Sequence, residues 1–412
     1  MAGATLTTLN GIMKEVYEGE INNQLQDEQV LSKRIEKSSE GVFENAGGKY
    51  VTFPVRTQRN HGISYRSENV ALAAAGKQGY AATQETLRYG YQRCTLSGPV
   101  MELSDSKPKA FATALDSEMT GAKDDVQRDV NRIMWGYYNA NASALSSCTG
   151  VMSAVTASSA GASTTVTAPT YGVIEPGMVI DIGTVSGTTF TAISSGTGLT
   201  VTSADAFASS FVVDVAVTTV ATTNFIVRTG NFNKEPYGLL GIVDDTGTYH
   251  NINSASAGNE YWRSYEDSTT TTLTEPAMIA VCDQIRKRGG SRPSAIFCSL
   301  GVRRAYFSLM TSLRRYNEPK EFSGGLIGLA FNYEKEIPVV SDLDAPNSTA
   351  LFLSEKDIMI YQTGDWKWAD FDGNVWKYVS GYDQWEAFMR KYWQVVTHKR
   401  NAHGKMTSIT EG

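Results

Sequence analysis

Residues 106–138 read SKPKAFATALDSEMTGAKDDVQRDVNRIMWGYY, and the rest of the chain is organised around them. Apolar side chains recur there at steps of three or four residues, which keeps one face of an α-helix. These positions are Phe111, Leu115, Met119, Ala122, Val126, Val130, Ile133 and Tyr137. Polar side chains between them, including Arg128, Asp129 and Arg132, predict a solvated opposite face. A rod of roughly 40 Å with one narrow apolar stripe needs a sheet or another helix laid along it.

Composition limits the classes of protein to consider. The chain has 412 residues, 41% of them hydrophobic, and a formal charge of −6. This charge argues against a protein that grips nucleic acid phosphates. No apolar run reaches the roughly 18 residues of a membrane span, and no secretory signal is apparent, so we expect a protein used without export. The four cysteines lack metal-site spacing and are interpreted as buried thiols: Cys94, Cys148, Cys282 and Cys298.

Residues 1–48 predict an N-terminal arm. Helical periodicity is patchy there and is interrupted by glycines, and eight acidic residues stand against four basic ones. The arm has too few apolar residues to bury itself. It is therefore expected either to be disordered or to lie on another surface.

Residues 49–100 predict a long β-hairpin. Apolar and polar residues alternate over 51–55 and again over 87–91, with a small-residue segment between them. Seven Lys and Arg stand against two Glu from 49 to 98, so the charge is opposite to that of the arm. Isolated two-stranded hairpins are marginal in water. We therefore expect neighbouring copies of the chain to complete both arm and hairpin.

Residues 150–230 predict an inserted all-β domain. No Lys or Arg occurs over the 95 residues 133–227. Six short β-rich runs separated by Gly, Ser and Pro favour a small barrel or sandwich, and a disordered Ser/Thr linker is the alternative. The runs are 164–167, 178–182, 188–193, 199–202, 211–220 and 225–228.

The remaining sequence predicts an α+β body. Thr274, Pro276 and the pair Gly289-Gly290 bound a helix over 274–288, and a second helix is expected over 301–315. Strands are expected over 238–243, 295–298, 337–340, 351–353, 358–361 and 384–396. Five of the seven tryptophans lie in 366–393, where core packing is a simpler interpretation than a stacking platform for sugars or bases.

No catalytic, cofactor or metal site is predicted. Asp245-Thr246-Gly247 matches the aspartic-protease triplet, but it occurs once and also suits a turn. Asp370-x-Asp372-Gly373 lacks the register of a calcium loop and suits a hairpin between Trp368 and Trp376. The four histidines lack metal-ligand spacing, and no phosphate loop is present. We therefore expect a protein that is not an enzyme.

The order of these parts resembles the major capsid proteins of tailed bacteriophages, which have the Hong Kong 97-like fold. The resemblance assigns seven segments: N-arm 1–48, extended loop 49–100, spine helix and start of the peripheral domain 101–149, insertion 150–230, peripheral domain 231–274, axial domain 275–365 and peripheral strands 366–412. Local strings also resemble actinobacteriophage capsid proteins. They are GLLGIVDDTGT (238–248), IPVVSD (337–342) and KRNAH (399–403).

The resemblance implies self-assembly. Hexamers and pentamers would form an icosahedral head that encloses double-stranded DNA, assembled in the host cytoplasm and present in the virion. Expected partners are other copies of the chain, a portal protein, a separate scaffolding protein and, on some heads, a decoration protein, with no membrane involved. Arg56, Arg59, Arg66 and Arg88 of the hairpin and Glu15, Glu18 and Glu20 of the arm are the predicted intersubunit contacts.

Some relatives crosslink a hairpin lysine to a neighbouring subunit, and Lys77 is the counterpart that the resemblance suggests. A solvated lysine is the simpler interpretation. Two other functions stay open on the sequence: the shell of an encapsulin-type bacterial compartment, and a β-rich phage tail or adhesin protein. The adhesin alternative accounts for the insertion but not for the one-faced helix or the arm.

Overall fold

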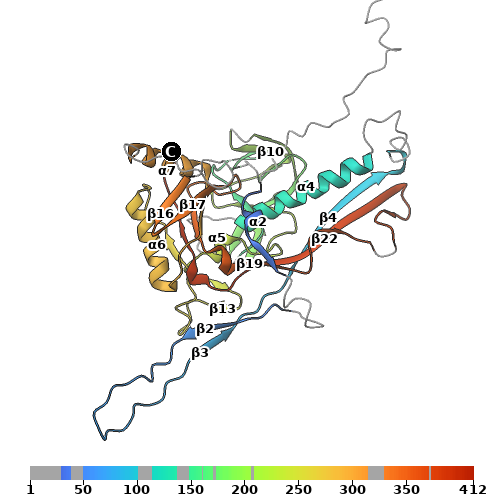
Figure 1. Cartoon of the computed structure of the whole chain (residues 1–412). Helices are drawn as coiled ribbons and strands as arrows, with labels where there is room; N and C mark the ends of the chain where they lie inside the picture. The colour runs from blue at the N-terminus through green and yellow to red at the C-terminus, as the bar shows by residue number, and fades with distance from the viewer. Residues whose placement is uncertain are drawn as a thin grey trace, which may run out of the picture. The chain divides into compact units, whose positions relative to one another are not determined.

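The computed structural model describes residues 29–38, 50–100, 114–136, 148–159, 161–169, 173–205, 208–313, 329–370 and 373–412. They form two compact units, whose elements Figure 1 labels. The smaller unit contains described residues of 91–126 and 368–389, and the larger contains those of 28–90, 127–367 and 390–412. Helix and strand content make the protein an α+β fold.

The predicted central helix is α4, Ala114–Trp135. Ala122, Val126 and Val130 are buried, as the apolar stripe predicts. Gly136 ends the helix with φ of 71°, and its N–H donates to the carbonyl of Arg132 (3.1 Å). The two ends of the predicted range, 106–113 and 137–138, lie outside the described residues.

The prediction of a solvated second face on α4 is wrong for its C-terminal half. Arg132 is only 8% exposed, and Arg128 and Asp129 are half-buried. All three side chains form ion pairs with residues of the inserted domain or its connecting segment. The apolar period locates the stripe that faces the core, but it cannot show that a second layer covers the polar face.

In the smaller unit, β4 (Arg88–Ser97) buries alternate side chains. Cys94 and Leu96 are buried, whereas their neighbours along the strand point to the exposed face. β21 (Lys377–Tyr378) is antiparallel to β22 (Gln384–Thr397), with Tyr378 opposite Trp385. β4 also pairs with β22, and Arg93 forms an ion pair with Glu386.

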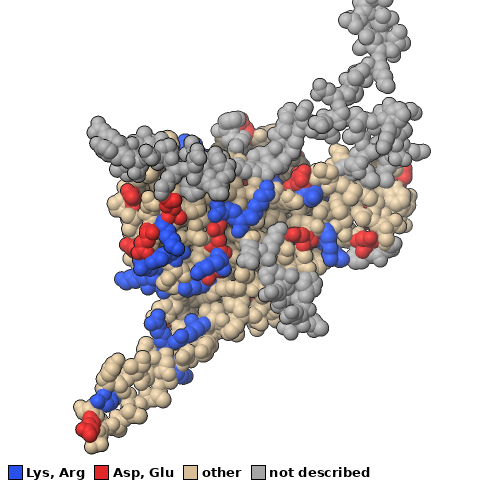
Figure 2. Space-filling view, in the orientation of Figure 1, with Lys and Arg blue, Asp and Glu red and all other residues tan. Residues whose placement is uncertain are grey.

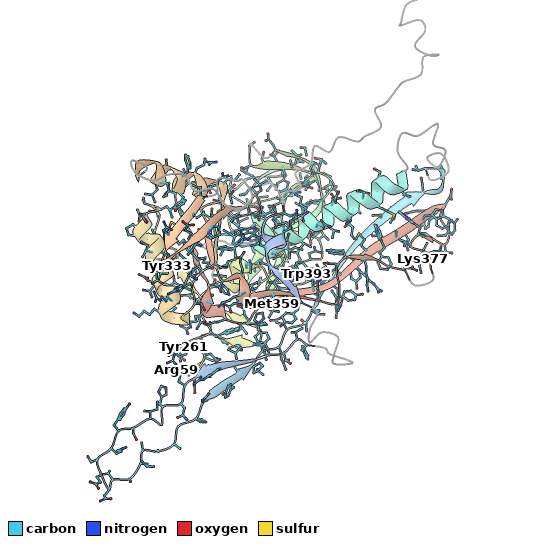
Figure 3. All side chains as sticks on the ribbon, viewed as in Figure 1. Arg59, Tyr261, Tyr333, Met359, Lys377 and Trp393 are labelled. Atoms are coloured by element: carbon cyan, nitrogen blue, oxygen red, sulfur yellow. The ribbon has the colours of Figure 1, made fainter. Side chains whose placement is uncertain are left out.

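In the larger unit, the short helix α2 (Leu31–Arg34) and strand β1 (Glu36–Ser38) belong to the predicted arm. β1 runs parallel to β19 (Ile358–Gln362), which is antiparallel to β22. Figure 3 labels Met359 on β19 and Trp393 on β22. Leu31, Trp135, Leu239, Phe297 and Trp393 are among the fully buried members of one core. Part of the arm is therefore held on its own subunit.

A second sheet of the larger unit takes strands from distant parts of the sequence. Its order is β14 (Tyr265–Asp267), β23 (Gly404–Met406), β18 (Ala350–Leu353), β15 (Ala295–Cys298), β17 (Lys335–Ser341) and β16 (Leu329–Tyr333). α6 (Glu275–Gly289) and α7 (Leu300–Leu313) pack against this sheet through a core that includes Cys282, Ile285 and Tyr306. As predicted, Thr274 caps α6 and Gly290 follows it in the left-handed conformation.

One expected strand is a helix. Residues 238–243 contain α5 (Leu239–Ile242), in which the N–H of Val243 donates to the carbonyl of Leu239 (2.7 Å). Leu239, Leu240 and Ile242 are all buried, and a short continuous apolar run fits a buried helical turn as well as a strand. Smaller elements complete the body: β12 (Thr248–Tyr249), β13 (Ile252–Asn253), η3 (Glu355–Asp357) and η4 (Arg400–Ala402).

All six β-rich runs of the insertion are strands, and a further strand precedes them. The sheet order is β5 (Val151–Ala154), β11 (Phe225–Arg228), β7 (Val179–Ser186), β9 (Leu199–Asp205), β10 (Ser210–Val217) and β6 (Ser163–Thr167), with β8 (Thr189–Ala192) paired to β7. A separate core of valines, isoleucines and Phe211 underlies it. Of the two expected architectures, a barrel or a sandwich, the described residues do not form a closed barrel, because the end strands β5 and β6 are not paired in this sheet.

The tryptophan-rich segment is structural where it is described. Trp393 is 1% exposed, and a Cβ on Gly90 would lie 2.7 Å from the Trp366 ring. The expected hairpin between Trp368 and Trp376 is wrong, because β20 (Lys367–Trp368) and β21 both pair with β22. A long neighbouring strand offers each short segment a partner. Alternation along the sequence could not reveal this.

Candidate assembly surfaces

The extended loop is a narrow two-stranded ribbon. β2 (Pro54–Gln58) is antiparallel to β3 (Gly79–Ala82), and Val51 forms an isolated bridge with Glu85. Figure 1 shows this ribbon continuing into a long open loop. The return strand expected at 87–91 is wrong as to its partner, because these residues belong to β4 and pair with β22. Alternation identified a strand but could not choose its neighbour.

A set of hydrogen bonds joins the root of the hairpin to the body of the protein. The N–H of Phe53 donates to the Thr83 hydroxyl (2.9 Å), and that hydroxyl donates to the carbonyl of Phe53 (2.8 Å). The N–H of Gln84 donates to the carbonyl of His250 (3.0 Å), and the N–H of His250 donates to a Glu85 carboxylate oxygen (2.9 Å). The hairpin therefore joins the body through backbone groups and one buried carboxylate.

His250 lies at the centre of this attachment and is fully buried. Its Nδ1 is 3.0 Å from Glu85 Oε1, and its Nε2 accepts from the N–H of Thr397 (3.2 Å). The rings of Phe53, Tyr237 and Trp262 surround it at centroid distances of 6.0–6.3 Å. Sequence spacing gave no sign of this role, since the hydrogen-bond partners Thr397 and Glu85 are 147 and 165 residues away.

His403 extends the network to the next layer. Its Nδ1 accepts from the N–H of Ser354 (3.2 Å), so its Nε2 carries the hydrogen that faces the Thr397 hydroxyl (3.1 Å). That hydroxyl donates to the carbonyl of Asp357 (3.1 Å). Complete burial lowers the pKa of His403 to about 4. The site therefore holds a neutral imidazole at neutral pH.

The distal part of the hairpin has the opposite character. Ile63 is 81% exposed, Tyr65 97% and Leu72 87%. No strand is described between residues 59 and 78. Gly62 and Gly76 bring the two chains of the loop together, because a Cβ on Gly76 would lie 2.7 Å from the Gly62 nitrogen. This loop exposes apolar side chains that gain free energy when another surface covers them.

The predicted contact residues fall into three groups. Arg56, Arg59 and Arg66 are exposed on the hairpin, and Figure 3 labels Arg59 near its root. Figure 2 shows basic side chains along the same ribbon. Arg88 is half-buried and lies close enough to Tyr237 for its charge to act against the rise that burial causes in the pKa of Tyr237, so it belongs to the attachment of the hairpin instead. Lys77 is exposed, and the predicted arm residues Glu15, Glu18 and Glu20 lie outside the described residues.

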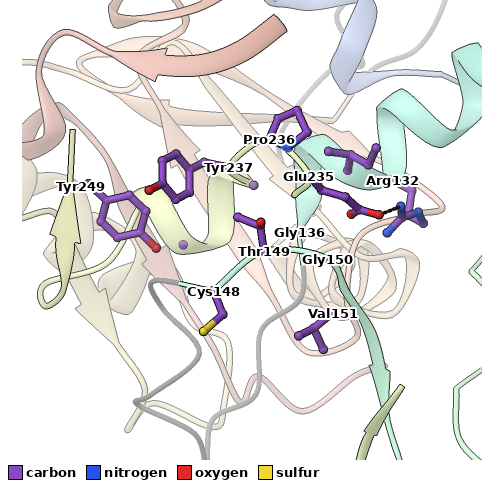
Figure 4. Close-up of a pocket in the computed structure, with 13 residues that line it drawn as sticks. Arg132, Gly136, Cys148, Thr149, Gly150, Val151, Glu235, Pro236, Tyr237 and Tyr249 are labelled. Atoms are coloured by element: carbon purple, nitrogen blue, oxygen red, sulfur yellow. Dashed lines mark hydrogen bonds and ion pairs between the residues drawn. The ribbon is translucent and has the colours of Figure 1, made fainter. Parts of the chain in front are cut away.

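Where the inserted domain meets α4, a chain of ion pairs links them. Arg128 pairs with Glu175, and Asp129 pairs with Arg228 (3.4 Å). Arg132 bonds to Asp129 (2.8 Å) and to Glu235 (3.0 Å), as Figure 4 shows for the second pair. Burial acts to raise the pKa of Asp129, but the charges of Arg132 and Arg228 outweigh it and lower that pKa. The domain is thus fixed to the helix by compensated charges.

The two chain connections of the inserted domain enclose a cavity of about 20 Å³ (Figure 4). Its lining includes Gly136, Thr149, Glu235, Tyr237 and Tyr249. A space of this size accommodates about one water molecule and is far below the several hundred Å³ typical of ligand pockets. This cavity is therefore too small for a substrate or cofactor.

Asp244, Asp245 and Glu266 converge closely enough to suggest a metal site. The cation already present there is the buried ammonium of Lys405, 2.9 Å from Asp244 and 3.5 Å from Glu266. Asp244 also accepts from the N–H and hydroxyl of Thr246 (both 2.8 Å), so the Asp-Thr-Gly triplet forms the turn that the simpler interpretation predicts. The carboxylates serve a structural ion pair.

The remaining sequence predictions concern thiols and membrane spans. All four cysteines are free; Cys94, Cys282 and Cys298 are buried, and Cys148 is half-buried. Burial raises the pKa of Cys282 and of Cys298 to about 12, which keeps both as unreactive thiols. Among the described residues, no helix has the length and apolarity to cross a bilayer.

No protein-family model matches the sequence, and no curated protein matches it. Solved structures do. The chain is similar to a chain of the cyanophage A-1(L) capsid asymmetric unit, with a TM-score of 0.60, 14% identity and coverage of 99% of this chain and 100% of that one. It is also similar to a capsid chain of a native GTA particle, with a TM-score of 0.51, 10% identity and coverage of 99% and 100%.

Both likenesses extend over the whole chain, including the arm root, the hairpin, the central helix and the two sheets. At 10–14% identity they carry information about architecture and not about individual residues. Each likeness covers 99% of this chain, so it concerns the fold as a whole and not one part of it. The protein therefore has the Hong Kong 97-like capsid-protein fold.

Proposed function

We propose that this chain is the major capsid protein of a tailed double-stranded DNA bacteriophage. Its copies would assemble as hexamers and pentamers into the icosahedral head that encloses the genome. The observation that carries the proposal is the hairpin, whose outer loop exposes Ile63, Tyr65 and Leu72 on a chain with a capsid-protein fold. A protein that acted as a single subunit would have no use for such a loop.

The energetics of the loop favour assembly. Full burial of one large apolar side chain contributes about 1.5–3 kcal/mol, so three of them on a neighbour supply several kcal/mol per contact. Ordering the loop and the subunit opposes this gain, which leaves each contact modest. A shell repeats the contact in every subunit, and head-to-tail contacts that close on themselves form rings. Weak individual contacts thus give a particle that is hard to dissolve.

Charge supports a partner of the same sequence. The hairpin carries exposed Arg56, Arg59 and Arg66, whereas residues 1–48 carry an excess of acidic side chains. Opposite charges on two parts of one chain steer identical copies together and select the register. The net charge of −6 also suits an envelope for packed DNA, since tight phosphate binding would hinder filling and release.

The proposed location is the virion, with assembly in the host cytoplasm. A portal protein, a separate scaffolding protein and, on some heads, a decoration protein would act with this chain. DNA would be enclosed without recognition of its sequence. A covalent bond from Lys77 would appear on a denaturing gel of boiled particles as bands above the 44.8 kDa chain, whereas one band at that mass would exclude the bond.

Electron microscopy of the purified protein tests the proposal directly. Closed shells or tubes are expected, and particles from infected cells should contain DNA. Protein-filled shells without DNA would instead identify an encapsulin-type compartment. Monomers that never assemble, with or without scaffolding protein, would contradict the proposal.

Limited trypsin digestion gives a second test. Arg59, Arg66 and Lys77 lie in an exposed loop, so free subunits should be cut there first. Assembled particles should resist cleavage at these sites if neighbouring subunits cover the loop. Cleavage at Lys287 on the folded helix α6 is the internal control, because its helical backbone resists trypsin in both states. Equal cutting of the loop in both states would contradict subunit contacts by the hairpin.

A further inference from the structure

The root of the N-terminal arm lies on the body of its own subunit. Leu31 is fully buried and Ile35 is 4% exposed, both in the core that contains Trp135 and Phe297. Lys33 and Arg34 are exposed on the outer side of α2. Arg34 pairs with Glu355 (2.7 Å). Apolar burial therefore accounts for part of the docking, and the backbone of α2 needs separate partners.

One amide and one carboxyl group supply those partners, and a second carboxyl group binds the amide. The N–H of Leu31 donates to Asp342 Oδ2 (3.2 Å), and the N–H of Ser32 donates to Asn131 Oδ1 (3.1 Å). Because Asn131 Oδ1 accepts from Ser32, its Nδ2 faces the carboxyl groups. That Nδ2 donates to Asp342 Oδ1 (3.1 Å) and to Asp344 Oδ2 (2.6 Å). The arm root, α4 and the loop after β17 meet at this point.

The two carboxyl groups share a site with few donors. Asp342 is 2% exposed and Asp344 is 9% exposed. Asp342 Oδ1 also accepts from the N–H of Asp344 (2.9 Å). Asp344 Oδ1 is buried and has no hydrogen-bond partner among the described residues. Asp342 therefore has hydrogen-bond donors at both carboxylate oxygens, which suits an anion, whereas Asp344 has a donor at one oxygen only.

The surroundings of Asp344 both raise and lower its pKa. Burial raises its pKa, the Asn131 hydrogen bond lowers it, and the Asp342 charge raises it. Arg128 and Arg132 on α4 also lower it, and the outcome is a pKa of about 6. On the described helix α2 of the arm, the charged side chains are Lys33 and Arg34, and Arg34 is engaged with Glu355.

We propose that the Asp342–Asp344 pair is a proton-binding site that fastens the root of the N-terminal arm. With one proton on the pair, Asp342 carries the single negative charge and accepts the Leu31 N–H, and the protonated Asp344 keeps the Asn131 bond. With both carboxyl groups ionised, two like charges face each other in a buried site, and one amide cannot compensate both. Separation of the pair then withdraws the acceptor of the Leu31 N–H and releases the Asn131 amide, whose oxygen accepts from the Ser32 N–H.

The direction of the coupling follows from proton binding. The docked arm favours protonated Asp344, so docking is strongest at low pH and weakens as the pH rises from the ordinary carboxyl value of 3.8 to about 6. Above pH 6 no further change is expected from this group. The inference concerns a single chain and does not rest on the proposed shell function.

Hydrogen exchange of the intact protein tests this coupling. We would follow the peptide that contains Leu31 and Ser32 by mass spectrometry from pH 4.5 to 7, corrected for intrinsic exchange rates. If undocking returns Asp344 to its ordinary pKa, protection should fall about 25-fold as the pH rises, mostly below pH 6. A peptide within α6 reports any global change in stability over the same range.

Asp344→Asn replaces the titratable carboxyl group with an amide, which is uncharged and can still hydrogen-bond to its neighbours. This variant should hold the arm root with protection that no longer depends on pH. Asp181→Asn, at an acidic residue of the inserted domain, is the matched control and should retain the wild-type profile. Flat protection in the wild type, or protection that rises with pH at Leu31 and Ser32 alone, would overturn the proposal even if the Asp344 variant failed to fold.

Discussion

The hairpin and the inserted domain are two long excursions from one body, and they differ in where their apolar side chains lie. In the inserted domain, Ile180, Ile182 and Phe211 are at most 1% exposed within a core of their own. In the outer hairpin loop, Tyr65 and Leu72 are 97% and 87% exposed. The inserted domain has an apolar core within the chain, whereas no described residue covers these apolar side chains of the outer hairpin loop.

The two excursions are also attached by different chemistry. The inserted domain is fixed to α4 by permanent charges, with Arg132 between Asp129 and Glu235. The hairpin is fixed by a hydrogen-bond network through the Glu85 carboxylate, His250 and, beyond it, the imidazole of His403. Arginine keeps its charge at any accessible pH, and histidine does not. The difference predicts which attachment responds to acid.

The largest expected effect is in the core of the inserted domain. Phe211→Ala should lower the free energy of unfolding of that domain by about 3–5 kcal/mol, because it removes a buried ring and leaves a cavity. Chemical denaturation followed by hydrogen exchange of peptides within 179–217 measures this loss. Val215→Ala on the same strand is the control, since Val215 is 51% exposed and its truncation should change stability little.

If Phe211→Ala left the inserted domain as stable as the wild type, the contrast between the inserted domain and the hairpin would fail. This result would mean that the inserted domain also borrows its stability, from neighbouring subunits or from the body. The measurement should be made on both unassembled and assembled protein. Stability that comes from neighbouring subunits would differ between the two states, whereas stability that comes from the body would not.

Acid should weaken the hairpin root and spare the inserted domain, which contains no histidine. Because the pKa of His403 is lowered from 6.5 to about 4, the unfolded chain takes up the proton first. The stabilisation from neutral His403 is complete above pH 6.5 and is lost progressively down to about pH 4, for a total of about 3 kcal/mol. Hydrogen exchange of the peptide over 79–85 between pH 7 and 4.5 measures the loss.

Asp344 contributes a pH dependence of opposite sign over part of this range, so the measurement belongs in the Asp344→Asn background. His403→Gln should flatten the profile of the hairpin root while lowering its protection at pH 7. Hydrogen exchange of peptides from β7 and β10 in the inserted domain is the control. Equal loss of protection in both regions would show that acid acts on the whole chain and not on this attachment.

Sequence reasoning succeeded where one local pattern determines the structure. The period of α4, the Thr274 cap with Gly290 beyond α6, and the β-rich runs of the insertion are each contained in a short segment. Such patterns depend on the backbone and on the immediate neighbours, so they remain valid in any tertiary context that buries one face.

Sequence reasoning failed where a residue's structure depends on a partner that is distant in the sequence. The strand at 87–91 was assigned to the hairpin because alternation does not specify a neighbour, and Arg132 was assigned to solvent because the inserted domain that covers it lies elsewhere in the chain. The attachment site was missed for the same reason. His250 is an isolated histidine in the sequence, and its positive φ of 52° and its buried carboxylate partner appear only in three dimensions.

The next effect concerns the point where the inserted domain leaves the body. Gly238 and Gly136 are in backbone contact there, and a Cβ on Gly238 would lie 2.5 Å from the Cα of Gly136. Since backbone cannot move aside cheaply, Gly238→Ala should cost about 1–3 kcal/mol in thermal or chemical unfolding. Gly121→Ala on α4 is the matched control. Its Cβ meets nothing within 4 Å, so it should stabilise the helix by about 0.5–1 kcal/mol.

An unchanged stability in Gly238→Ala would show that the connection of the inserted domain is pliable. The domain would then move on its connecting segments, and the ion pairs of Arg132 would be its main restraint. A loss confined to peptides of the inserted domain would instead confirm that this close contact fixes the domain to the end of α4.

The smallest expected effect on stability is also the most informative for function. Tyr65→Ser combined with Leu72→Ser removes two exposed apolar side chains from the outer hairpin loop. Because neither side chain is buried in its own subunit, the free energy of unfolding of the unassembled protein should change by no more than about 0.5 kcal/mol. The same variant should fail to form shells, or form them only at a much higher protein concentration.

Thr202→Ala, on an exposed strand position of the inserted domain, is the control and should leave both stability and assembly unchanged. Assembly is measured by light scattering and electron microscopy, and stability by denaturation of the unassembled subunits. If the double variant destabilises the single subunit, the loop packs on its own chain in solution and the contrast with the inserted domain fails. If it assembles normally, the apolar side chains of the loop are not the contact that joins subunits, and the basic side chains of the ribbon become the surface to test.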